Sequence, residues 1–183
     1  MASGIELWLV RHGQTESNAD GRLSGWSDVD LTAEGRTQAR ALRSRLAGNS
    51  FDGVWSSDLR RAVATARLAF GEPRPDRRLR EICFGELENR RWAEIEESYR
   101  RDLDEFTRFH APGGEDLNTF RERLLAFVAE LDPGRHLAFT HGGVIRSLTA
   151  GLGEDRFLGN GGLIVVDWKN RRLLEVFEPY PFG

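Results

Sequence analysis

Four short apolar runs punctuate the chain, and most of them are separated by longer amphipathic stretches. The runs are "IELWLV" at residues 5–10, "GVW" at 53–55, "HLAFT" at 136–140 and "GLIVVDW" at 162–168. Each is too short and too uniformly apolar for a surface helix, so the pattern predicts buried strands. The last run continues into "LIVVDWKNRRLLEVFE", which predicts a hairpin that turns at Lys169 and Asn170.

The stretches between the strands have the spacing of amphipathic helices. In residues 31–48, apolar residues recur at helical intervals behind a Thr32 cap, and the pattern stops at Gly48. Ser57 is placed to cap a second helix over residues 58–70. Further helices are expected over residues 91–109, 117–131 and 144–151.

Strands that alternate with helices are typical of an α/β fold. We therefore expect a three-layer α/β/α sandwich whose sheet is largely parallel with an antiparallel edge strand. The chain, residues 1–183, has a length that fits one domain. The long segment without a predicted strand, residues 81–116, is expected to form a cap over one end of the sheet.

The net charge of −3 and the single cysteine narrow the classes of function. This charge gives no long-range attraction to a nucleic-acid backbone or an anionic membrane, so neither is an expected partner. Cys83 alone forms neither an internal disulfide nor a multi-thiolate zinc site. The N-terminus lacks a secretory pattern and no apolar stretch approaches about 18 residues, so we expect a soluble, cytoplasmic protein.

Candidate chemistry lies where the predicted strands end, because ligands of an open parallel sheet bind beyond the carboxyl ends of its strands. Helix N-termini at Ser57 and Gly142 add free backbone N–H groups at that edge. Two guanidinium groups and two imidazoles join them and predict a site for a dianion, in particular a phosphoryl group. These four side chains are Arg11, His12, Arg60 and His141.

Several competing sites are excluded by their motifs. The only lysine, Lys169, does not stand in the GxxxxGK[ST] motif of a P-loop. The stretch "GRLSG" is not the GxSxG of a nucleophile elbow, and "GLGEDR" is not GxGxxG. The histidines show no HxxxH or HxH spacing, so no metal site is predicted. Phosphoryl transfer through histidine, without a metal or another cofactor, remains.

Five motifs follow one another over nearly the whole chain. They are "LVRHGQTESN", "SGWSDVDLTAEGRTQA", "SSDLRRAVATA", "LREICFGELE" and "FTHGGVIR". In this order, and through RHG, SDLxRA and THGG together, they resemble the successive motifs of the histidine phosphatase superfamily, also called the phosphoglycerate mutase-like family. The resemblance implies the fold of that family and the hydrolysis of a small phosphomonoester.

The resemblance also implies a role for each site residue. His12 is expected to be the phosphorylated nucleophile and Glu81 of "LRE" the proton donor, with Glu86 as the rival acid five residues later. The groups expected around the phosphoryl group are Arg11, Arg60 and His141. Further contacts with the phosphate or the substrate are expected from Asn18, Ser24, Gly25 and Gly142.

The motifs are also compatible with a mutase, which is the alternative to a phosphatase. The stretch "GRLSGWSDVDLT" is close to that of cofactor-dependent phosphoglycerate mutases, which would make 2,3-bisphosphoglycerate the cofactor. Those mutases are longer and close an insert and a C-terminal tail over the site, whereas this cap has only the short acid-rich segment 93–109. A short cap leaves a phosphoenzyme open to water. We therefore expect a phosphatase, similar to the α-ribazole phosphatases or to broad-specificity members of the family.

A third hypothesis, from another class, is a non-catalytic phosphate-binding domain. Such a domain is free to lose the nucleophile or the acid, and here His12 and Glu81 are both present. The sequence leaves a monomer and a homodimer open as oligomeric states. The edge hairpin that ends in "VFEPYPFG" offers an apolar surface for a partner.

Overall fold

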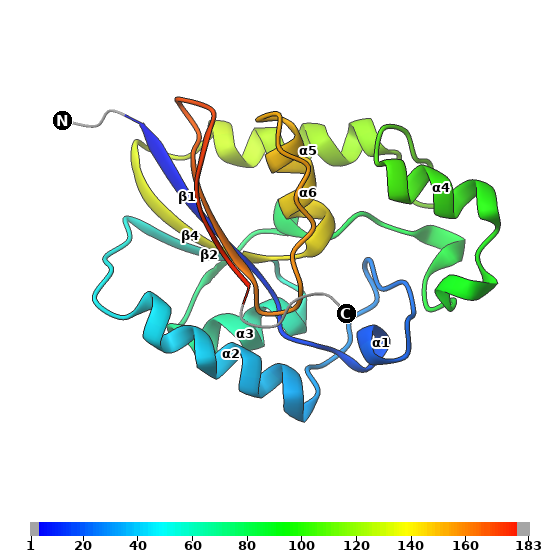
Figure 1. Cartoon of the computed structure of the whole chain (residues 1–183), viewed down its shortest axis with the longest axis horizontal. Coiled ribbons are helices and arrows are strands. Elements are labelled where there is room, and N and C mark those ends of the chain that lie inside the picture. The colour runs from blue at the N-terminus through cyan, green and yellow to red at the C-terminus, as the bar shows by residue number, and fades with distance from the viewer. Residues whose placement is uncertain (1–3, 179–183) are drawn as a thin grey trace.

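A single six-stranded sheet forms the centre of the molecule (Figure 1). The computed structural model describes residues 4–178. Its strands are β1 (Ile5–Arg11), β2 (Gly53–Ser56), β3 (Arg74–Pro75), β4 (Gly134–Thr140), β5 (Leu163–Asp167) and β6 (Arg172–Phe177). They lie in the order β3-β2-β4-β1-β5-β6, with parallel pairing from β3 to β1. Strand β5 runs antiparallel to both of its neighbours, so the sheet is largely parallel with an antiparallel edge, as predicted.

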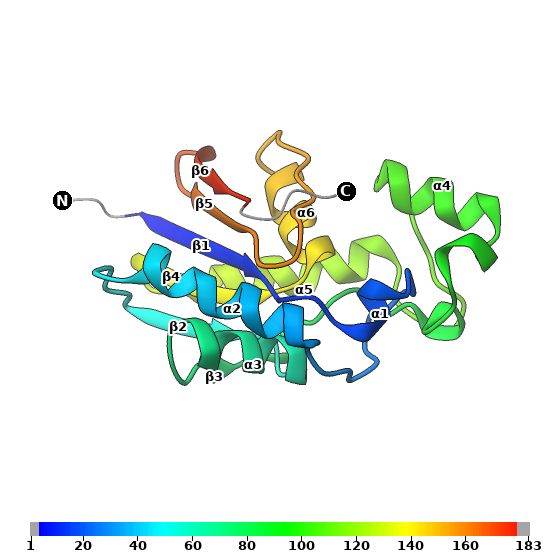
Figure 2. The same ribbon diagram turned by 60° about the horizontal axis from the view of Figure 1, so that its bottom comes forward.

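Helices cover both faces of this sheet. They are α1 (Glu16–Ala19), α2 (Ala33–Leu46), α3 (Arg60–Ala69), α4 (Glu97–Glu105), α5 (Leu117–Ala129) and α6 (Gly142–Ala150). Helices α5 and α6 lie on one face, and α2 and α3 lie on the other (Figures 1 and 2). This arrangement confirms the predicted three-layer α/β/α sandwich. No helix within residues 4–178 is long and apolar enough to cross a membrane.

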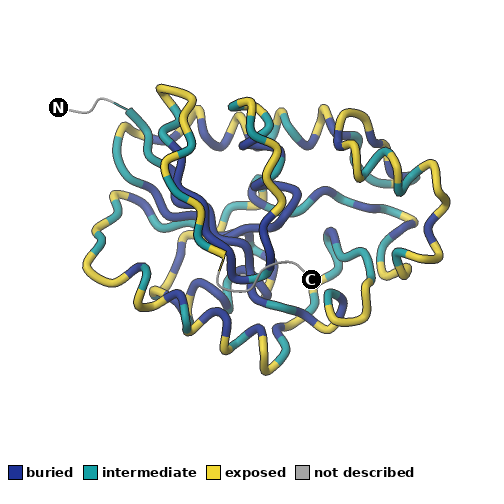
Figure 3. Tube along the Cα trace, in the orientation of Figure 1, coloured by how far each residue is buried: buried dark blue, intermediate teal, exposed yellow. Residues whose placement is uncertain are grey.

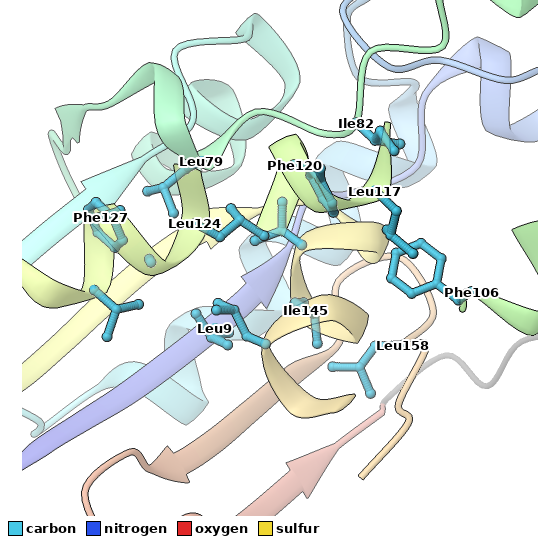
Figure 4. Packing of buried hydrophobic residues seen from close by; sticks show 14 of the residues in the cluster. Leu9, Leu79, Ile82, Phe106, Leu117, Phe120, Leu124, Phe127, Ile145 and Leu158 are labelled. Carbon is cyan, nitrogen blue, oxygen red and sulfur yellow. The ribbon is translucent and has the colours of Figure 1, made fainter. Parts of the chain in front are cut away.

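Successive side chains of β1 enter two different hydrophobic cores. Leu7 and Leu9 belong to the core that α5 and α6 complete, and Trp8 and Val10 belong to the core of α2 and α3. Figure 3 shows the central strands β1 and β4 buried toward their carboxyl ends, and Figure 4 shows Leu9, Leu124 and Ile145 in the same cluster. A strand buried on both faces has a continuous apolar sequence, which explains the pattern of residues 5–10.

The last two strands form the predicted hairpin. Strand β5 ends at Asp167 and β6 begins at Arg172, and the turn between them contains Lys169 and Asn170. The Asn170 N–H donates to Asp167 Oδ1 at 3.0 Å, a side-chain contact that closes a turn locally. Residues 179–183, which end the stretch "VFEPYPFG", lie outside the described residues.

Two helices start at positions that differ from the expected ones. The predicted cap at Ser57 is wrong, because α3 starts only after Leu59, whose side chain makes no capping hydrogen bond. Ser57 still continues the pairing of β2 with β4 through its N–H, which donates to Phe139 O at 2.9 Å, and its Oγ accepts from Leu59 N at 3.4 Å, before the helix begins. Leu59 then has extended backbone angles of φ −70° and ψ 137°, so the first helical residue of α3 is Arg60. Helix α6 begins at Gly142, two residues earlier than expected.

The cap, residues 81–116, is less helical than its sequence suggests. The helix expected over residues 91–109 is only α4, preceded by a single 3-10 turn at Trp92–Glu94. Helix α4 ends where Phe106 takes a left-handed conformation with φ 51°. Figure 2 shows α4 standing beyond the end of the sheet, on the side where α1 lies. The cap therefore reaches past the carboxyl ends of the central strands.

Candidate active site

The two histidines expected at strand ends lie next to each other. Arg11 ends β1 and is paired with Thr140, which ends β4. His12 and His141 therefore leave the sheet from adjacent strands, and their ring centroids are 5.1 Å apart at an interplanar angle of 66°. His12 is 5% exposed and His141 is completely buried. The parallel register of two strands thus brings together residues that are far apart in the sequence.

The hydrogen bonds of His12 determine which ring nitrogen carries the proton. Arg61 Nε, which can only donate, lies 3.2 Å from His12 Nε2, so Nε2 is the acceptor. His12 Nδ1 then carries the hydrogen and donates to Gly13 O at 2.7 Å. Burial, together with the positive charges of Arg61 and Arg11, holds the pKa of His12 well below its usual value. The ring is therefore neutral, with its lone pair on Nε2.

The carbonyl that orients His12 belongs to a tightly packed backbone. The Gly13 N–H donates to Thr65 Oγ1 at 3.1 Å. A β-carbon at Gly13 would lie 2.2 Å from Gly35 O, and one at Gly35 would lie 2.0 Å from Gln14 O. The chain after the nucleophile candidate thus touches the start of α2 without space for a side chain on either side.

Arg61, and not Arg60, is the guanidinium at this site. The expectation for Arg60 is corrected because its side chain is 59% exposed and pairs with Asp28 and Asp30 at 3.3 and 3.6 Å. Arg61 is 1% exposed and donates to Ser27 O and Gly25 O at 2.8 and 2.7 Å, besides its bond to His12. Adjacent residues of a helix point about 100° apart, so the start of α3 decides which arginine faces inward.

Arg11 is the second buried guanidinium. It is 6% exposed, donates through Nη1 to Leu158 O, and lies 4.7 Å from the centroid of the Phe157 ring. Burial is the main cause that lowers the pKa of Arg11 to about 10, and burial likewise lowers the pKa of Arg61 to about 10. Both side chains remain charged at neutral pH. They give the site two fixed positive charges beside a neutral His12.

His141 has two buried nitrogens that no described group satisfies. Neither Nδ1 nor Nε2 has a hydrogen-bond partner within residues 4–178. Burial is the largest cause that keeps the pKa of His141 well below its usual value, and the charge of Arg61 adds to it. A buried polar group without a partner costs about 1–3 kcal/mol. The folded chain therefore keeps a destabilising, unpartnered imidazole beside His12, which is typical of a site that binds a ligand.

Glu81 is the acid that lies at the site, and Glu86 is not. Glu81 Oε2 accepts from Gly143 N at 2.9 Å, at the start of α6, and Oε1 accepts from Ile82 N at 3.0 Å. Burial raises the pKa of Glu81 above its usual value, although these two hydrogen bonds oppose the shift. Glu86 is exposed, and its backbone N–H donates to Pro112 O at 2.8 Å.

A further carboxylate, Glu88, holds the loop at residues 24–27. It was not among the site residues predicted from the sequence. It accepts from the backbone N–H groups of Gly25, Trp26 and Ser27 at 3.1, 2.8 and 3.2 Å. It also accepts from Phe84 N at 3.1 Å, which joins this loop to the cap. The signal for it was its place in "FGELE", the motif that also contains Glu86.

The remaining predicted contacts fall into two groups. Asn18, Ser24 and Gly142 line the cavity described below. Asn18 Oδ1 accepts from Thr15 N at 3.1 Å, whereas Ser24 Oγ is buried without a partner among the described residues. Gly25 does not fit the expected contact, because its N–H donates to Glu88 and its carbonyl accepts from Arg61.

A cavity of about 730 Å³ opens in front of these groups. Arg11, His12 and Glu81 lie on its wall. Arg61 contacts His12 at Nε2 and His141 lies beside the His12 ring, but neither is among the residues that line the cavity. The outer part is mostly apolar and is shared between the cap and neighbouring loops. Its apolar lining residues are Leu23, Ile82, Phe84, Trp92, Leu103, Phe106 and Phe157.

The described residues contain no group of three or more histidine, cysteine, aspartate or glutamate side chains that could hold a metal ion. The positive charge of the site comes instead from Arg11 and Arg61. The arrangement offers a neutral imidazole, the guanidinium of Arg11 and a carboxyl of raised pKa on one cavity, with the guanidinium of Arg61 against the imidazole. Such a set suits the transfer of a phosphoryl group.

Comparison with known proteins agrees with this chemistry. Residues 7–174 match the family model of the histidine phosphatase superfamily (branch 1). The chain is 35% identical over 162 residues to the adenosylcobalamin/alpha-ribazole phosphatase of Escherichia coli strain K12, covering 81% of this chain and 79% of that protein. It is 39% identical over 150 residues to the probable phosphoglycerate mutase GpmB of Salmonella choleraesuis, covering 75% and 70%.

A solved structure shows the same fold. The crystal structure of phosphoglycerate mutase from Thermus thermophilus superposes with a TM-score of 0.88 at 47% identity, covering 93% of this chain and 97% of that one. The phosphoglycerate mutase-like fold that the motifs imply is thereby confirmed, and the phosphatase relative supports a phosphatase hydrolase activity. The chain belongs to the histidine phosphatase superfamily.

Proposed function

We propose that this protein hydrolyses a small phosphomonoester through a phosphohistidine at His12, without a metal ion or another cofactor. One observation carries the proposal: Nδ1 of His12 is fixed on Gly13 O, and Nε2 accepts from the buried Arg61, in surroundings that keep the pKa of the ring low and the ring neutral. An imidazole in this state is a nucleophile at neutral pH and needs no base to deprotonate it.

In the first step, His12 Nε2 attacks the phosphorus and the bond from phosphorus to the ester oxygen breaks. The Arg61 Nε–H that occupies Nε2 must turn to a phosphoryl oxygen, a stronger, charged acceptor. Arg11 and His141 are placed to share the charge that spreads over the transferring group. The dianion would favour a proton on His141 and would accept a hydrogen bond from one of its two unpartnered nitrogens.

Glu81 would supply the proton that the leaving oxygen needs. Burial raises its pKa, and an approaching dianion favours the protonated carboxyl further. In the second step the resulting carboxylate would take a proton from a water molecule as that water attacks the phosphohistidine. His12 leaves as neutral imidazole and inorganic phosphate is released, so protons and charge balance over the cycle.

The substrate class follows from the outer part of the cavity. Most of its lining surface is apolar, although Arg22, Asp104, Arg146 and Asp155 also line the cavity, and Arg146 is already paired with Asp155. This lining favours a ring-containing or otherwise apolar leaving group over a short carboxylate. One relative is named adenosylcobalamin/alpha-ribazole phosphatase, after substrates of this kind. We propose that the site binds a small phosphorylated metabolite. The oligomeric state stays a prediction of monomer or homodimer.

A phosphoglycerate mutase is the second candidate, because relatives at 39 and 47% identity carry that name. A mutase must keep the phosphorylated intermediate away from water while it reorients. The two candidates differ in their product: a phosphatase releases phosphate, and a mutase forms an isomeric phosphoester with 2,3-bisphosphoglycerate as cofactor.

The test is a steady-state assay with EDTA present. The substrates are p-nitrophenyl phosphate, α-ribazole phosphate, and 3-phosphoglycerate with and without 2,3-bisphosphoglycerate, and His12→Ala is the control. We expect phosphate release that survives EDTA and falls by on the order of 10⁵-fold or more in the variant, the scale of losing a covalent nucleophile. Acid-labile, base-stable phosphate on the quenched protein would report the phosphohistidine.

Two other results would overturn the proposal. Formation of 2-phosphoglycerate that depends on the bisphosphate, with little phosphate released, would make the protein a mutase. Phosphoester binding without turnover of any substrate would make it a phosphate-binding domain.

A further inference from the structure

The proposed acid lies on a segment that has almost no regular structure of its own. After the 3-10 turn Arg77–Leu79, Arg80 is extended, and no helix or strand holds Glu81. A general acid must nevertheless stay within hydrogen-bond reach of the leaving oxygen. The groups that hold the backbone at Glu81 therefore matter to the chemistry as much as the carboxyl itself.

One side chain of α5 binds this backbone at three points of its path. Arg123 Nη1 donates to Arg78 O and Arg80 O at 2.6 and 2.8 Å. Arg123 Nη2 donates to Glu81 O at 2.8 Å. The guanidinium also stacks over Phe120 of the same helix, with 4.7 Å between its carbon and the ring centroid.

Glu115 completes the set of partners for Arg123. It accepts from Arg123 Nε at 2.8 Å and from Nη2 at 2.9 Å, in the bidentate geometry that arginine favours. Both side chains are largely buried, at 16 and 13% exposure. Glu115 also accepts from Cys83 N at 2.9 Å, so it holds the chain two residues beyond Glu81. All five N–H donors of Arg123 are thereby engaged.

A third group meets Arg123 at the same carbonyl. Trp26 Nε1 donates to Glu81 O at 2.9 Å, so both lone pairs of that oxygen are used. Trp26 lies in the loop whose neighbouring carbonyls accept from Arg61. The backbone of the acid is thus fixed from α5 on one side and from the loop beside the nucleophile on the other.

We propose that Arg123, held by Glu115, is a positioning residue that keeps Glu81 in place to protonate the leaving oxygen. The inference rests on the proposed function. It attributes to Arg123 no contact with substrate, because its five donors are occupied by protein groups. Lysine cannot replace it, since one ammonium group lacks the fork that serves three carbonyls and a carboxylate.

The experiment compares two substrates that differ in their need for an acid. Benzyl phosphate leaves as an alkoxide that must be protonated, whereas 2,4-dinitrophenyl phosphate leaves as a stable phenolate. The value of kcat/KM reports the first step alone, so the role of Glu81 in the second step does not interfere. Glu81→Gln defines the selectivity expected when the acid is lost.

In Arg123→Met we expect kcat/KM to fall by about tenfold for benzyl phosphate and by less than about twofold for 2,4-dinitrophenyl phosphate. The tenfold loss is a part of the ~10²–10⁴-fold rate increase that a positioned general acid contributes. Arg123→Lys should show the same selectivity. Because Arg123→Met leaves Glu115 buried and unpaired, the double variant with Glu115→Gln is measured as well. Thermal melts show that each variant is folded under the assay conditions.

Arg78→Met is the matched control. Arg78 pairs with Asp76 of its own segment at 2.7 Å and with Glu130, the residue that follows α5, at 2.8 Å, but it does not bind the backbone of Glu81 with its side chain. We expect the ratio of the two kcat/KM values to stay as in the wild type.

The outcomes separate this inference from the proposed function. If the wild type shows no His12-dependent hydrolysis, the proposed function fails first. The positioning role is wrong if Glu81→Gln slows benzyl phosphate more than 2,4-dinitrophenyl phosphate but the Arg123 variants slow both substrates equally. It is also wrong if Arg123→Lys keeps the wild-type kcat/KM for both substrates. If Glu81→Gln is not selective either, Glu81 is not the acid, and the inference fails with that assignment.

Discussion

The two ends of the cavity are built in different ways. At the inner end, His12, Arg11 and Arg61 are at most 6% exposed and are held by the backbone carbonyls of Gly13, Leu158 and Gly25. At the outer end, α4 has no buried residue and closes on a left-handed Phe106. The first end has the rigidity that positioned chemistry requires. The second is less buried: α4 contacts the core through the partly buried Tyr99 and Leu103, and the buried Phe106 and Phe109 follow it.

Another contact joins the cap to the rest of the molecule. Arg146 of α6 donates to Leu103 O and Asp104 O at 2.8 and 2.6 Å, and its other donors bind Asp155. Segments with few buried contacts open at low free energy, and they carry the variable part of a site. The comparison teaches that, under the proposed function, the groups for phosphoryl transfer and the surface for the leaving group lie in parts of the molecule that differ in burial.

The largest effect should come from the inner end. We expect Arg61→Met to lower kcat by about 10³-fold, the scale of removing a preorganised donor, because both the orientation of His12 and the grip on the phosphoryl group are lost. Arg60→Met, one residue away but exposed and paired with Asp28 and Asp30, should stay within about threefold. A larger loss in Arg60→Met than in Arg61→Met would contradict the assignment of the inner guanidinium.

The acid provides the next test. We expect Glu81→Gln to lower kcat for an alkyl phosphate by about 10²-fold or more, and to remove the alkaline limb of the pH profile, because a glutamine carries no titrating proton. Glu86→Gln should keep the wild-type profile, since Glu86 lies exposed outside the cavity. A reversed result in these two pH profiles would show that the rival glutamate is the acid.

The pH dependence of stability tests the buried imidazoles. His12 and His141 have pKa values well below 6.5 in the folded chain, so between pH 6.5 and those values the unfolded chain binds protons that the folded chain does not. Stability should therefore fall as pH decreases from 6.5, by about 1.4 kcal/mol per unit for each histidine. The raised pKa of Glu81 works in the opposite direction, at pH values nearer its usual range.

Urea denaturation at pH 5.0 to 7.0 checks this expectation. His141→Asn should reduce the slope of stability against pH by the contribution of one histidine. His110→Asn, at an exposed position on the cap, serves as the control. An unchanged slope in His141→Asn would mean that His141 does not resist protonation in the folded protein.

The smallest effect should come from the tie at the outer end. In Arg146→Met we expect KM to rise about fivefold with kcat nearly unchanged, because the cap loses its anchor while the chemistry stays intact. Hydrogen exchange of α4 should become faster. Arg108→Met is the control on the same cap, with a 71% exposed side chain that pairs with Asp102 at 3.4 Å. A fall in kcat rather than a rise in KM would mean that the two ends are coupled.

Much of the fold is predictable because its signals are local. Strands buried on both faces have continuous apolar runs, and Thr32 caps α2 by accepting from Gly35 N at 3.0 Å, as its position suggests. The start of α3 is not predictable in this way. Ser57 has the right side chain for a cap, but its backbone still pairs with Phe139, on a strand far along the chain, and the helix begins only at Arg60.

The site follows the same division. His12 and His141 are predictable because each directly follows a strand, and parallel strands end at one edge. The distinction between Arg60 and Arg61 depends on where the helix begins, although the SDLxRA spacing and the inward stripe of Ala62, Thr65 and Ala66 pointed to Arg61. The hydrogen bonds of Glu88 and Arg123 depend on loops that meet only in three dimensions.

The close contact between Gly13 and Gly35 limits how this protein can change in evolution. A β-carbon at Gly13 would collide with the backbone of Gly35, and a β-carbon at Gly35 would collide with the backbone of Gln14. Because both collisions are with backbone atoms, a change of side chain at one position does not compensate for a substitution at the other. Both positions therefore have to remain glycine, and the Gly13 carbonyl that orients His12 keeps its place. The cap has no such restriction, so a lineage of this enzyme can acquire new substrates there while the phosphoryl chemistry is inherited unchanged.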